Sequence, residues 1–380
     1  MSTAIVFGAN GISGTALLGQ LVLSSPKQWK RIIAVSRRPP VLEHSDVRVV
    51  FKSIDLLGDV QGIAKDLHEA GGAEAAHVFF YAYLAKDNED ELVAVNRRLF
   101  ANTLDAVARA CPKLETFSLQ TGYKYYGAHL GGSDLSEYPW TEDTPRIQKS
   151  NFYYLQEDML SEAAKKNGWR WIVTRPGFIV GLSKGNFMSL AVTIALYATA
   201  RKALGQPLVY PGSSFSLNLP NDHSSAFNNA DFQIFAALNE ETGSGVYNIH
   251  DGDQLSFAEL WPKFAEYFDM AVCSLVADEA SPGFQEKIDV LTLHPSVDWT
   301  RANEAKLHAF AKDAGIDENS FKYATWDFLD MATSRTWPDQ ASMASARSIG
   351  WDRTIDSWEK GYKQVFDKLR QLGIIPAPDT

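Results

Sequence analysis

The first half of the chain alternates short apolar runs with longer segments that carry apolar residues at three- and four-residue spacing. The short runs cover residues 4–7, 31–36, 48–52, 77–81, 116–120 and 171–174, and the longer segments cover 15–23, 90–110 and 151–166. Short strands that alternate with amphipathic helices are typical of repeated strand–helix–strand units. We therefore predict an α/β fold with a doubly wound parallel sheet.

The pattern changes after Arg175-Pro176-Gly177, where loops rich in Gly, Pro and Ser separate helices without regular strands. A strand-like run at 245–249 predicts one return to the sheet. We predict a sheet domain at 1–180, a returning segment at about 218–250, and a smaller, mainly helical cap at 181–217 and 251–380.

Composition excludes several classes of protein. The 380 residues are 45% hydrophobic, which predicts a large core in two packed domains. The formal net charge of −10 disfavours nucleic acid and anionic membranes as partners. Cys111 and Cys273 have no spacing suited to a metal site. The apolar segment 187–200 is shorter than the ~20 residues that a membrane span needs. Because no signal pattern opens the chain, we expect a cytoplasmic protein, and a homodimer stays open.

A glycine motif, GANGISG at residues 8–14, lies between the first strand and the first helix. Glycines there permit a tight turn and close approach of a pyrophosphate to the helix N-terminus. The alternative is an ordinary glycine-rich turn. The context favours a Rossmann domain that binds a dinucleotide, with contacts from Gly8, Asn10, Gly11, Ile12 and Gly14.

The end of the second strand predicts the type of dinucleotide. It carries Ser36, Arg37 and Arg38 where an NAD enzyme usually presents a carboxylate to the ribose. A hydroxyl and two guanidinium groups suit a 2′-phosphate, so NADPH/NADP is favoured over NAD. A solvated basic turn is the alternative. Asp55 and Leu56, after the third strand, are expected near the adenine.

The fifth strand leads into LQTGYKYYG, which places Lys124 in the expected crevice at the carboxyl end of the sheet. Downstream, NFYYLQED opens a helix at Asn151. Short-chain dehydrogenases commonly place a lysine four residues after the catalytic tyrosine of this helix, but the residue four after Tyr154 is Asp158. The usual pair is absent.

The chain carries LQTGYKYYG, TEDTPR and NFYYLQED, in this order. It also carries GANGISG, SRRP, RPGFIVG, PLVYPG and the final WEKGYKQVFDKLRQLGIIP. Through these motifs it resembles the progesterone 5β-reductase and iridoid synthase-like family over essentially its whole length. The resemblance implies an extended short-chain dehydrogenase that reduces activated C=C bonds with NADPH. It also implies Lys124 and a tyrosine of NFYY as the catalytic pair. We expect Tyr154, because Glu162 follows it by eight residues, as an acidic residue often does in dehydrogenases; Tyr153 stays open.

Further contacts rest partly on the resemblance. Expected cofactor contacts are Tyr81, Ala82, Tyr83, Thr121, Gly122, Tyr154, Pro176, Phe178 and Ile179. Expected substrate contacts are Tyr125, which stands where many relatives have His, and Tyr153, Phe187 and Met188, the last two on an apolar helix that could equally be interdomain core. No metal site is expected, because His223 and His250 are isolated and the acidic run 87–91 suits a helix N-terminus.

These observations lead to one favoured reaction and two alternatives. Hydride transfer to the β-carbon of an enone or enal places negative charge on its carbonyl oxygen, which a phenol and an ammonium group stabilise. The substrate would be a small apolar carbonyl compound of terpenoid, steroid or polyketide-like type. The alternatives are an NADPH-dependent carbonyl reductase, and a non-redox isomerase, cyclase or dinucleotide sensor on the same fold.

Overall fold

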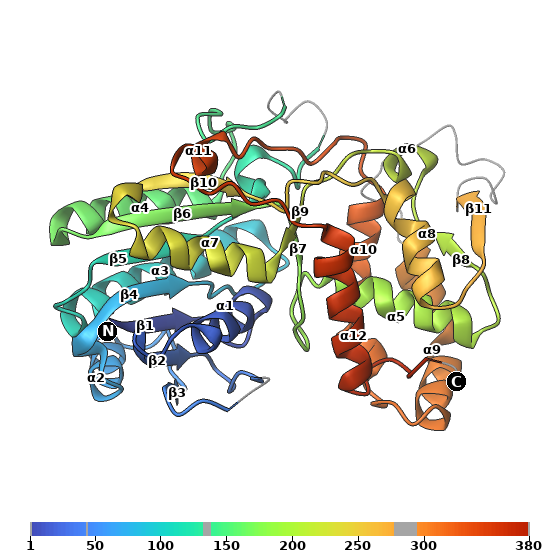
Figure 1. Ribbon diagram of the computed structural model, residues 1–380, viewed down its shortest axis with the longest axis horizontal. Helices are drawn as coiled ribbons and strands as arrows, with labels where there is room; N and C mark the ends of the chain where they lie inside the picture. The colour runs from blue at the N-terminus through green and yellow to red at the C-terminus, as the bar shows by residue number, and fades with distance from the viewer. Residues whose placement is uncertain (1, 43–44, 132–137, 277–294, 379–380) are drawn as a thin grey trace.

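The computed structural model describes residues 2–42, 45–131, 138–276 and 295–378, and these form two halves that meet along a central junction (Figure 1). One half is built on a seven-stranded parallel sheet with the strand order β10-β6-β5-β4-β1-β2-β3. Its strands are β1 (Ser2–Phe7), β2 (Trp29–Val35), β3 (Val49–Lys52), β4 (Ala75–Phe80), β5 (Thr116–Gln120), β6 (Arg170–Pro176) and β10 (Gly245–Ile249). The predicted doubly wound α/β fold is confirmed.

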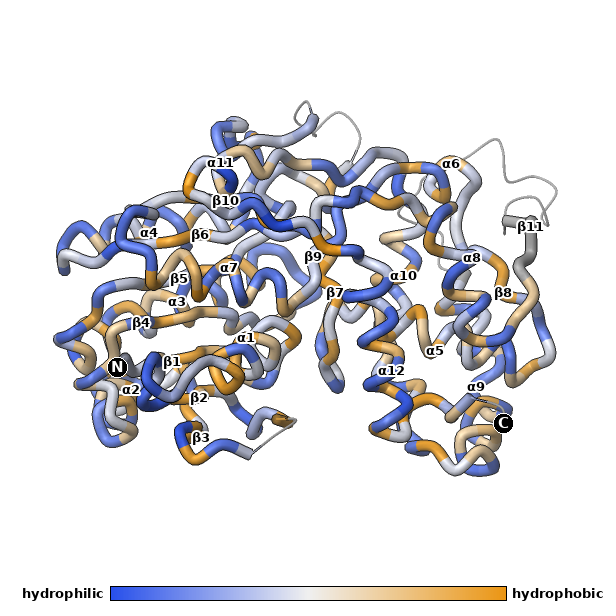
Figure 2. The backbone as a smooth tube through the Cα atoms, viewed as in Figure 1, coloured by the Kyte–Doolittle hydropathy of each residue, from blue (hydrophilic) through white to orange (hydrophobic). Residues whose placement is uncertain are grey.

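Helices cover both faces of this sheet. One face carries α1 (Ile12–Leu23), α7 (Ala226–Leu238) and α11 (Ala344–Ser348), and the other carries α2 (Val60–Glu69), α3 (Glu89–Ala110) and α4 (Phe152–Asn167). In β1, Ala4 and Val6 face the first layer while Ile5 and Phe7 face the second, because successive residues of a strand point to opposite faces. Both layers therefore bury apolar side chains against the sheet, whose strands show hydrophobic stretches mixed with polar residues (Figure 2).

The other half is mainly helical. Its longer elements are α5 (Leu190–Ala203), α8 (Phe257–Tyr267), α9 (Pro295–Asp313), α10 (Trp326–Thr333) and α12 (Lys363–Gln371), which follows the π-helical turn η8 (Ser357–Tyr362). Shorter elements are β7 (Phe178–Val180), β8 (Leu208–Tyr210), α6 (Ser214–Leu217), β9 (His223–Ser225) and β11 (Val272–Val276). An apolar core shared by α5, α8, α10 and α12 holds this half together.

The chain crosses between the halves more often than the expected boundaries allow. After the cap begins, α7 and β10 return to the sheet half. A second return was not expected: Met343 and Ala346 of the C-terminal region are buried with residues of α1 and α7. The expected cap boundary at 251–380 therefore does not describe this stretch, because apolar side chains there are buried on the sheet half.

No helix among the described residues combines the length and the apolarity that crossing a membrane requires. The apolar segment predicted at 187–200 forms α5, which begins only at Leu190. Phe187 and Met188 therefore precede the helix rather than lie on it. The helix begins there because the backbone N–H of Ser189 donates to Thr325 Oγ1, outside the helix, whereas the carbonyl of Ser189 accepts the first helical bond, from Thr193.

Candidate active site

The glycine loop joins β1 to α1 and is closed by backbone contacts. Gly8 has φ +76°, and a Cβ there would lie 2.7 Å from the carbonyl carbon of Tyr81. A Cβ on Gly14 would lie 2.3 Å from the carbonyl oxygen of Gly8. Gly11 caps α1 without a side-chain hydrogen bond, so the first N–H groups of this helix remain open to a ligand. The loop thus fits the pyrophosphate of a dinucleotide.

The end of β2 is tied to this loop. The N–H groups of Gly8 and Ala9 both donate to the carbonyl of Val35, at 2.9 and 3.2 Å. The next residue, Ser36, is buried and donates its hydroxyl to the carbonyl of Arg38 at 2.7 Å. The side chains of Arg37 and Arg38 are exposed. A basic turn therefore lies beside the glycine loop.

The turn after β3 has a different character. Asp55 is exposed and accepts from the N–H of Leu57 at 3.0 Å, while Leu56 is buried in the core. Asp55 and Leu56 lie outside the pocket described next. The same is true of Gly8, Asn10, Gly14, Ser36, Arg37 and Arg38. They occupy the carboxyl edge of the sheet, along which a dinucleotide would extend away from that pocket.

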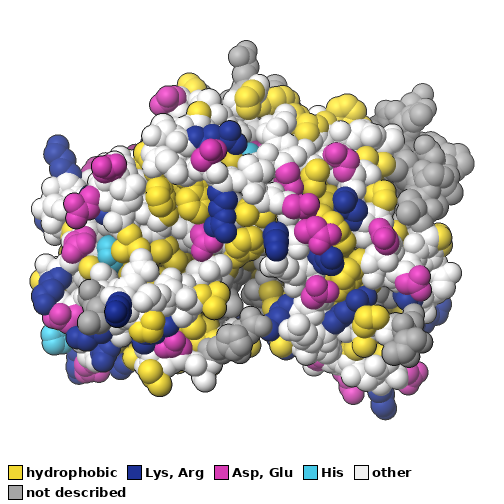
Figure 3. Space-filling view, viewed as in Figure 1, with side chains coloured by type: hydrophobic (Ala, Val, Ile, Leu, Met, Phe, Trp, Pro, Cys, Tyr) yellow, Lys and Arg dark blue, Asp and Glu magenta, His cyan; other side chains and the backbone are white. Residues whose placement is uncertain are grey.

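A pocket opens between the two halves, where a notch is visible in the molecular surface (Figure 3). From the expected set it is lined by Gly11, Ile12, Tyr81, Ala82, Tyr83, Thr121, Gly122, Lys124, Tyr153, Pro176, Phe178, Ile179, Phe187 and Met188. Residues of the sheet half form one wall. The segment before α5 and the cap helix α10 contribute the apolar side chains of the other.

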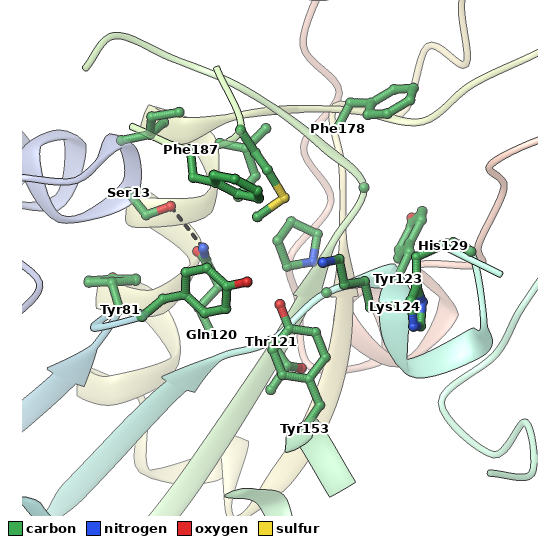
Figure 4. A pocket seen from close by; sticks show the side chains of 18 of the residues that line it. Ser13, Tyr81, Gln120, Thr121, Tyr123, Lys124, His129, Tyr153, Phe178 and Phe187 are labelled. Carbon is green, nitrogen blue, oxygen red and sulfur yellow. Dashed lines mark hydrogen bonds between the residues drawn. The ribbon is translucent and has the colours of Figure 1, made fainter. Parts of the chain in front are cut away.

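Tyr153 and Lys124 point toward the same space, with Phe187 facing them from across the pocket (Figure 4). Tyr153 comes from the first turn of α4, and Lys124 comes from the short helix η2 (Tyr123–Tyr126) after β5. Neither the Tyr153 hydroxyl nor the Lys124 ammonium has a hydrogen-bond or ion-pair partner within the described parts of the chain. Both polar groups are available to a bound molecule.

Burial changes the acidity of both groups. Desolvation raises the pKa of the Tyr153 phenol well above its usual value, and the negative charge of Glu157 adds to this rise. Desolvation lowers the pKa of Lys124, which the carboxylate of Glu89 partly opposes. Tyr153 therefore remains a protonated hydrogen-bond donor at neutral pH.

Tyr154, the tyrosine preferred from the sequence, does not reach the pocket. Its hydroxyl donates to the carbonyl of Tyr125 at 2.6 Å and accepts from the N–H of Ile147 at 3.1 Å. Glu162, whose spacing suggested Tyr154, is exposed. Consecutive helical residues point about 100° apart, so only one tyrosine of the pair can face the pocket. The expected placement of Tyr154 is corrected to Tyr153.

Tyr125 was expected to touch the substrate, and this placement is also corrected. Its ring is buried against Tyr154, with centroids 4.8 Å apart, and the guanidinium carbon of Arg175 lies 3.2 Å from its centroid. Arg175 in turn forms a buried ion pair with Glu157 at 2.7 Å. Tyr125 therefore belongs to a packed cluster behind the pocket wall.

Several pocket residues were not expected from the sequence. They are Ser13, Phe80, Gln120, Tyr123, Ala128, His129, Phe152, Gln156, Asn186, Phe328, Met331, Arg335 and Asp339. Gln120 ends β5 and donates to Ser13 Oγ at 2.8 Å, as the dashed line in Figure 4 marks. The strand-end position of Gln120 was a usable signal. Nothing in the sequence pattern could have placed Phe328 or Arg335, which reach the pocket through packing of the cap.

The two isolated histidines have structural surroundings. His223 is fully buried between the carbonyl of Leu255 and the hydroxyl of Tyr362, at 3.0 and 3.1 Å. His250 contacts the carbonyl of Ala341 through Nε2 at 3.0 Å. The acidic run 87–91 spans the beginning of α3, which Asn88 caps. Across the described ranges, no group of three or more His, Cys, Asp or Glu side chains is arranged to hold a metal.

Comparison with known proteins agrees with this architecture. The chain is 32% identical to the short chain dehydrogenase gsfE of Penicillium aethiopicum, over 98% of this chain and 99% of that protein. It is 34% identical to an (S)-8-oxocitronellyl enol synthase of Nepeta cataria, over 99% and 93%. Among solved structures, the epimerase Mth375 of Methanothermobacter thermautotrophicus matches 97% of this chain and 92% of its own, with a TM-score of 0.66 at 15% identity.

That structural match shows the fold alone, which is shared with a UDP-glucose 4-epimerase of Thermotoga maritima at a TM-score of 0.63 and 14% identity. The relatives found by sequence support more than the fold, because they indicate an oxidoreductase of the short-chain dehydrogenase type. The family model described as the PRISE-like Rossmann-fold domain matches residues 4–376. The resemblance inferred from the motifs is thus confirmed, and the chain belongs to the PRISE-like Rossmann-fold family.

Proposed function

We propose that the protein is an NADPH-dependent reductase of activated C=C bonds in small apolar enones or enals. The observation that carries this proposal is the convergence of the Tyr153 hydroxyl and the Lys124 ammonium in one pocket beside the glycine loop. The enol synthase relatives add support, since an enol is the first product when conjugate reduction leaves charge on a carbonyl oxygen.

A bound dinucleotide would supply the hydride for the β-carbon of the substrate. As the C=C bond is reduced, negative charge grows on the substrate carbonyl oxygen. Tyr153 donates a hydrogen bond to this oxygen, and Lys124 stabilises the same charge through its ammonium group. Because both side chains are themselves largely removed from water, these interactions are stronger than they would be in free solution.

The cap side of the pocket favours an apolar substrate. Phe187, Met188, Phe328 and Met331 line it with aromatic and thioether side chains. Such walls suit a terpenoid, steroid or polyketide-like skeleton whose carbonyl group points toward Tyr153.

The basic turn after β2 supports NADPH as the cofactor. Arg37 and Arg38 carry no ion pair with any carboxylate of the described ranges, and they lie where the adenosine 2′-phosphate of a dinucleotide on the glycine loop would be expected. Charge-assisted contacts to a phosphate contribute roughly 1.5 to 3 kcal/mol, which corresponds to a preference of about tenfold or more over NADH.

The proposal is tested by following oxidation of NADPH and of NADH with a panel of enones, enals and saturated ketones, with identification of each product. We expect saturated carbonyl products from the enones and a clear preference for NADPH. The Arg37→Ala/Arg38→Ala variant should lose this preference. Allylic alcohols as the main products would instead identify a carbonyl reductase.

A further inference from the structure

Gln156 is a buried amide that faces the pocket without a partner. It lies on α4 one helical turn after Tyr153, is 3% exposed, and lines the pocket. Its side chain forms no hydrogen bond with any residue that the structure describes, and its amide atoms keep access to the open space of the pocket. A glutamine amide offers two donors and an acceptor oxygen, all of which are available here to a molecule bound in the pocket.

The other amides of the pocket differ from Gln156. Gln120 is fixed by the bond from its Nε2 to Ser13, which leaves only a buried Oε1 without a described partner, and Asn186 is only partly buried and remains open to water. Asn229 is buried and also has no described partner, but its amide atoms are closed off from any open space. Gln156 thus combines burial, a free amide and access to the pocket. These are the properties of a side chain that hydrogen-bonds a ligand.

The ligand is identified by the wall to which Gln156 belongs. This residue, Tyr153 and Thr121 come from the sheet half, on the side of the glycine loop, whereas the apolar wall comes from the cap. Counted from Tyr153, the helix position that commonly carries lysine in short-chain dehydrogenases is Glu157, which is paired with Arg175. The wall beside Tyr153 therefore receives no cation from α4.

We propose that Gln156 holds the nicotinamide end of the dinucleotide by hydrogen bonds to its ribose hydroxyls, and so fills the place of the missing helix lysine. An amide that both donates and accepts suits a pair of neighbouring hydroxyls, each of which does the same. This inference rests on the proposed dinucleotide cofactor but not on the proposed C=C reduction.

The test uses Gln156→Met, which keeps the length of the side chain and removes the amide. Gln61→Met, at an exposed position of α2, is the matched control. Affinities for NADPH and for adenosine 2′,5′-bisphosphate, which lacks the nicotinamide half, are measured by titration calorimetry. We expect Gln156→Met to weaken NADPH binding about tenfold and to leave bisphosphate binding unchanged, because only the first ligand has the ribose in question.

Three results would overturn the inference: unchanged NADPH affinity, equal weakening of both ligands, or a raised KM for an enone with NADPH affinity intact. The last result would place Gln156 on the substrate. If the wild type binds NADPH and the Gln156 effect appears while no enone is reduced, only the proposed reaction fails. If the wild type binds no dinucleotide, both proposals fail.

Discussion

At the scale of single residues, the two adjacent tyrosines of α4 have separate tasks. Tyr153 directs a free hydroxyl into the pocket, whereas Tyr154 uses its hydroxyl twice, toward the carbonyl of Tyr125 and the N–H of Ile147. Tyr154 thereby fastens α4 to η2, the element that carries Lys124. One tyrosine therefore lines the pocket, and the other holds the element that carries Lys124.

This division predicts opposite results for two variants. Tyr153→Phe should reduce single-turnover NADPH oxidation by roughly a hundredfold and leave NADPH affinity and Tm unchanged, since it removes one preorganised donor. Tyr154→Phe should retain most of the turnover but lower the free energy of unfolding by about 1–3 kcal/mol, because two backbone groups lose their partner. Full activity of Tyr153→Phe together with loss of activity in Tyr154→Phe would reverse the assignment.

The lowered pKa of Lys124 predicts a pH dependence. In the proposed reaction the charged ammonium stabilises the developing oxyanion, so kcat should fall as pH rises through a pKa that lies below the usual 10.5. Lys124→Arg should move this fall to higher pH because guanidinium keeps its proton. Lys124→Met should show a low rate without the fall. A profile of kcat against pH from pH 6 to 10 checks these expectations. If kcat of Lys124→Met fell with pH as it does in the wild type, the fall would belong to another titrating group.

At the scale of elements, α1 carries glycines with different surroundings. A Cβ on Gly14 would meet the carbonyl oxygen of Gly8 at 2.3 Å, so the helix packs on the loop without room for a side chain. A Cβ on Gly19, in the same helix, would meet nothing within 4 Å. The beginning of α1 is therefore constrained by the loop and its middle is not.

The two positions give a matched pair of variants. Gly19→Ala should stabilise the protein by about 0.5–1 kcal/mol, because alanine is the better helix former. Gly14→Ala should destabilise it, because backbone must shift, and should weaken NADPH binding as the loop moves. Thermal melts and cofactor titrations of both variants measure these effects; a Gly14→Ala variant with wild-type Tm and affinity would contradict the packing argument.

The elements also show what could be predicted from the sequence. All seven strands of the sheet and the helices α1, α3 and α4 follow the apolar pattern of the sequence, because burial on a parallel sheet imposes it. The helix α2 was missed, since only Ile63 and Leu67 are buried on it. Lys124 was found because it follows a strand end. Tyr153 was not preferred over Tyr154, because spacing alone does not give the rotation of a helix about its axis.

At the scale of the whole molecule, buried titratable groups couple stability to pH. Burial lowers the pKa of His77 to about 4, and the nearby charge of Arg170 lowers it further. The unfolded chain thus binds more protons than the folded protein between about pH 4 and pH 6.5, so this histidine lowers stability as pH falls through that range. Asp251 acts in the opposite direction, because burial raises its pKa to about 7.

Replacing His77 isolates one part of this dependence. His77 packs edge-on against Trp29 with its Nδ1 lacking a partner in the described regions, so His77→Leu should fold. As pH falls from 6.5 to 4.5, the free energy of unfolding should decrease less in the variant than in the wild type. The difference between the two decreases should be about 1–3 kcal/mol. Urea denaturation at several pH values measures this difference. Parallel pH curves for the two proteins would show that His77 does not titrate on unfolding.

The position of β10 at one edge of the sheet has a consequence for synthesis. This strand pairs with β6 but follows it in the chain by almost seventy residues, most of which build the cap and α7. While the ribosome is still producing that stretch, β6 exposes an unpaired and apolar edge, the kind of surface on which chains aggregate. The nascent chain therefore carries an incomplete sheet edge until residues 245–249 emerge and pair with β6.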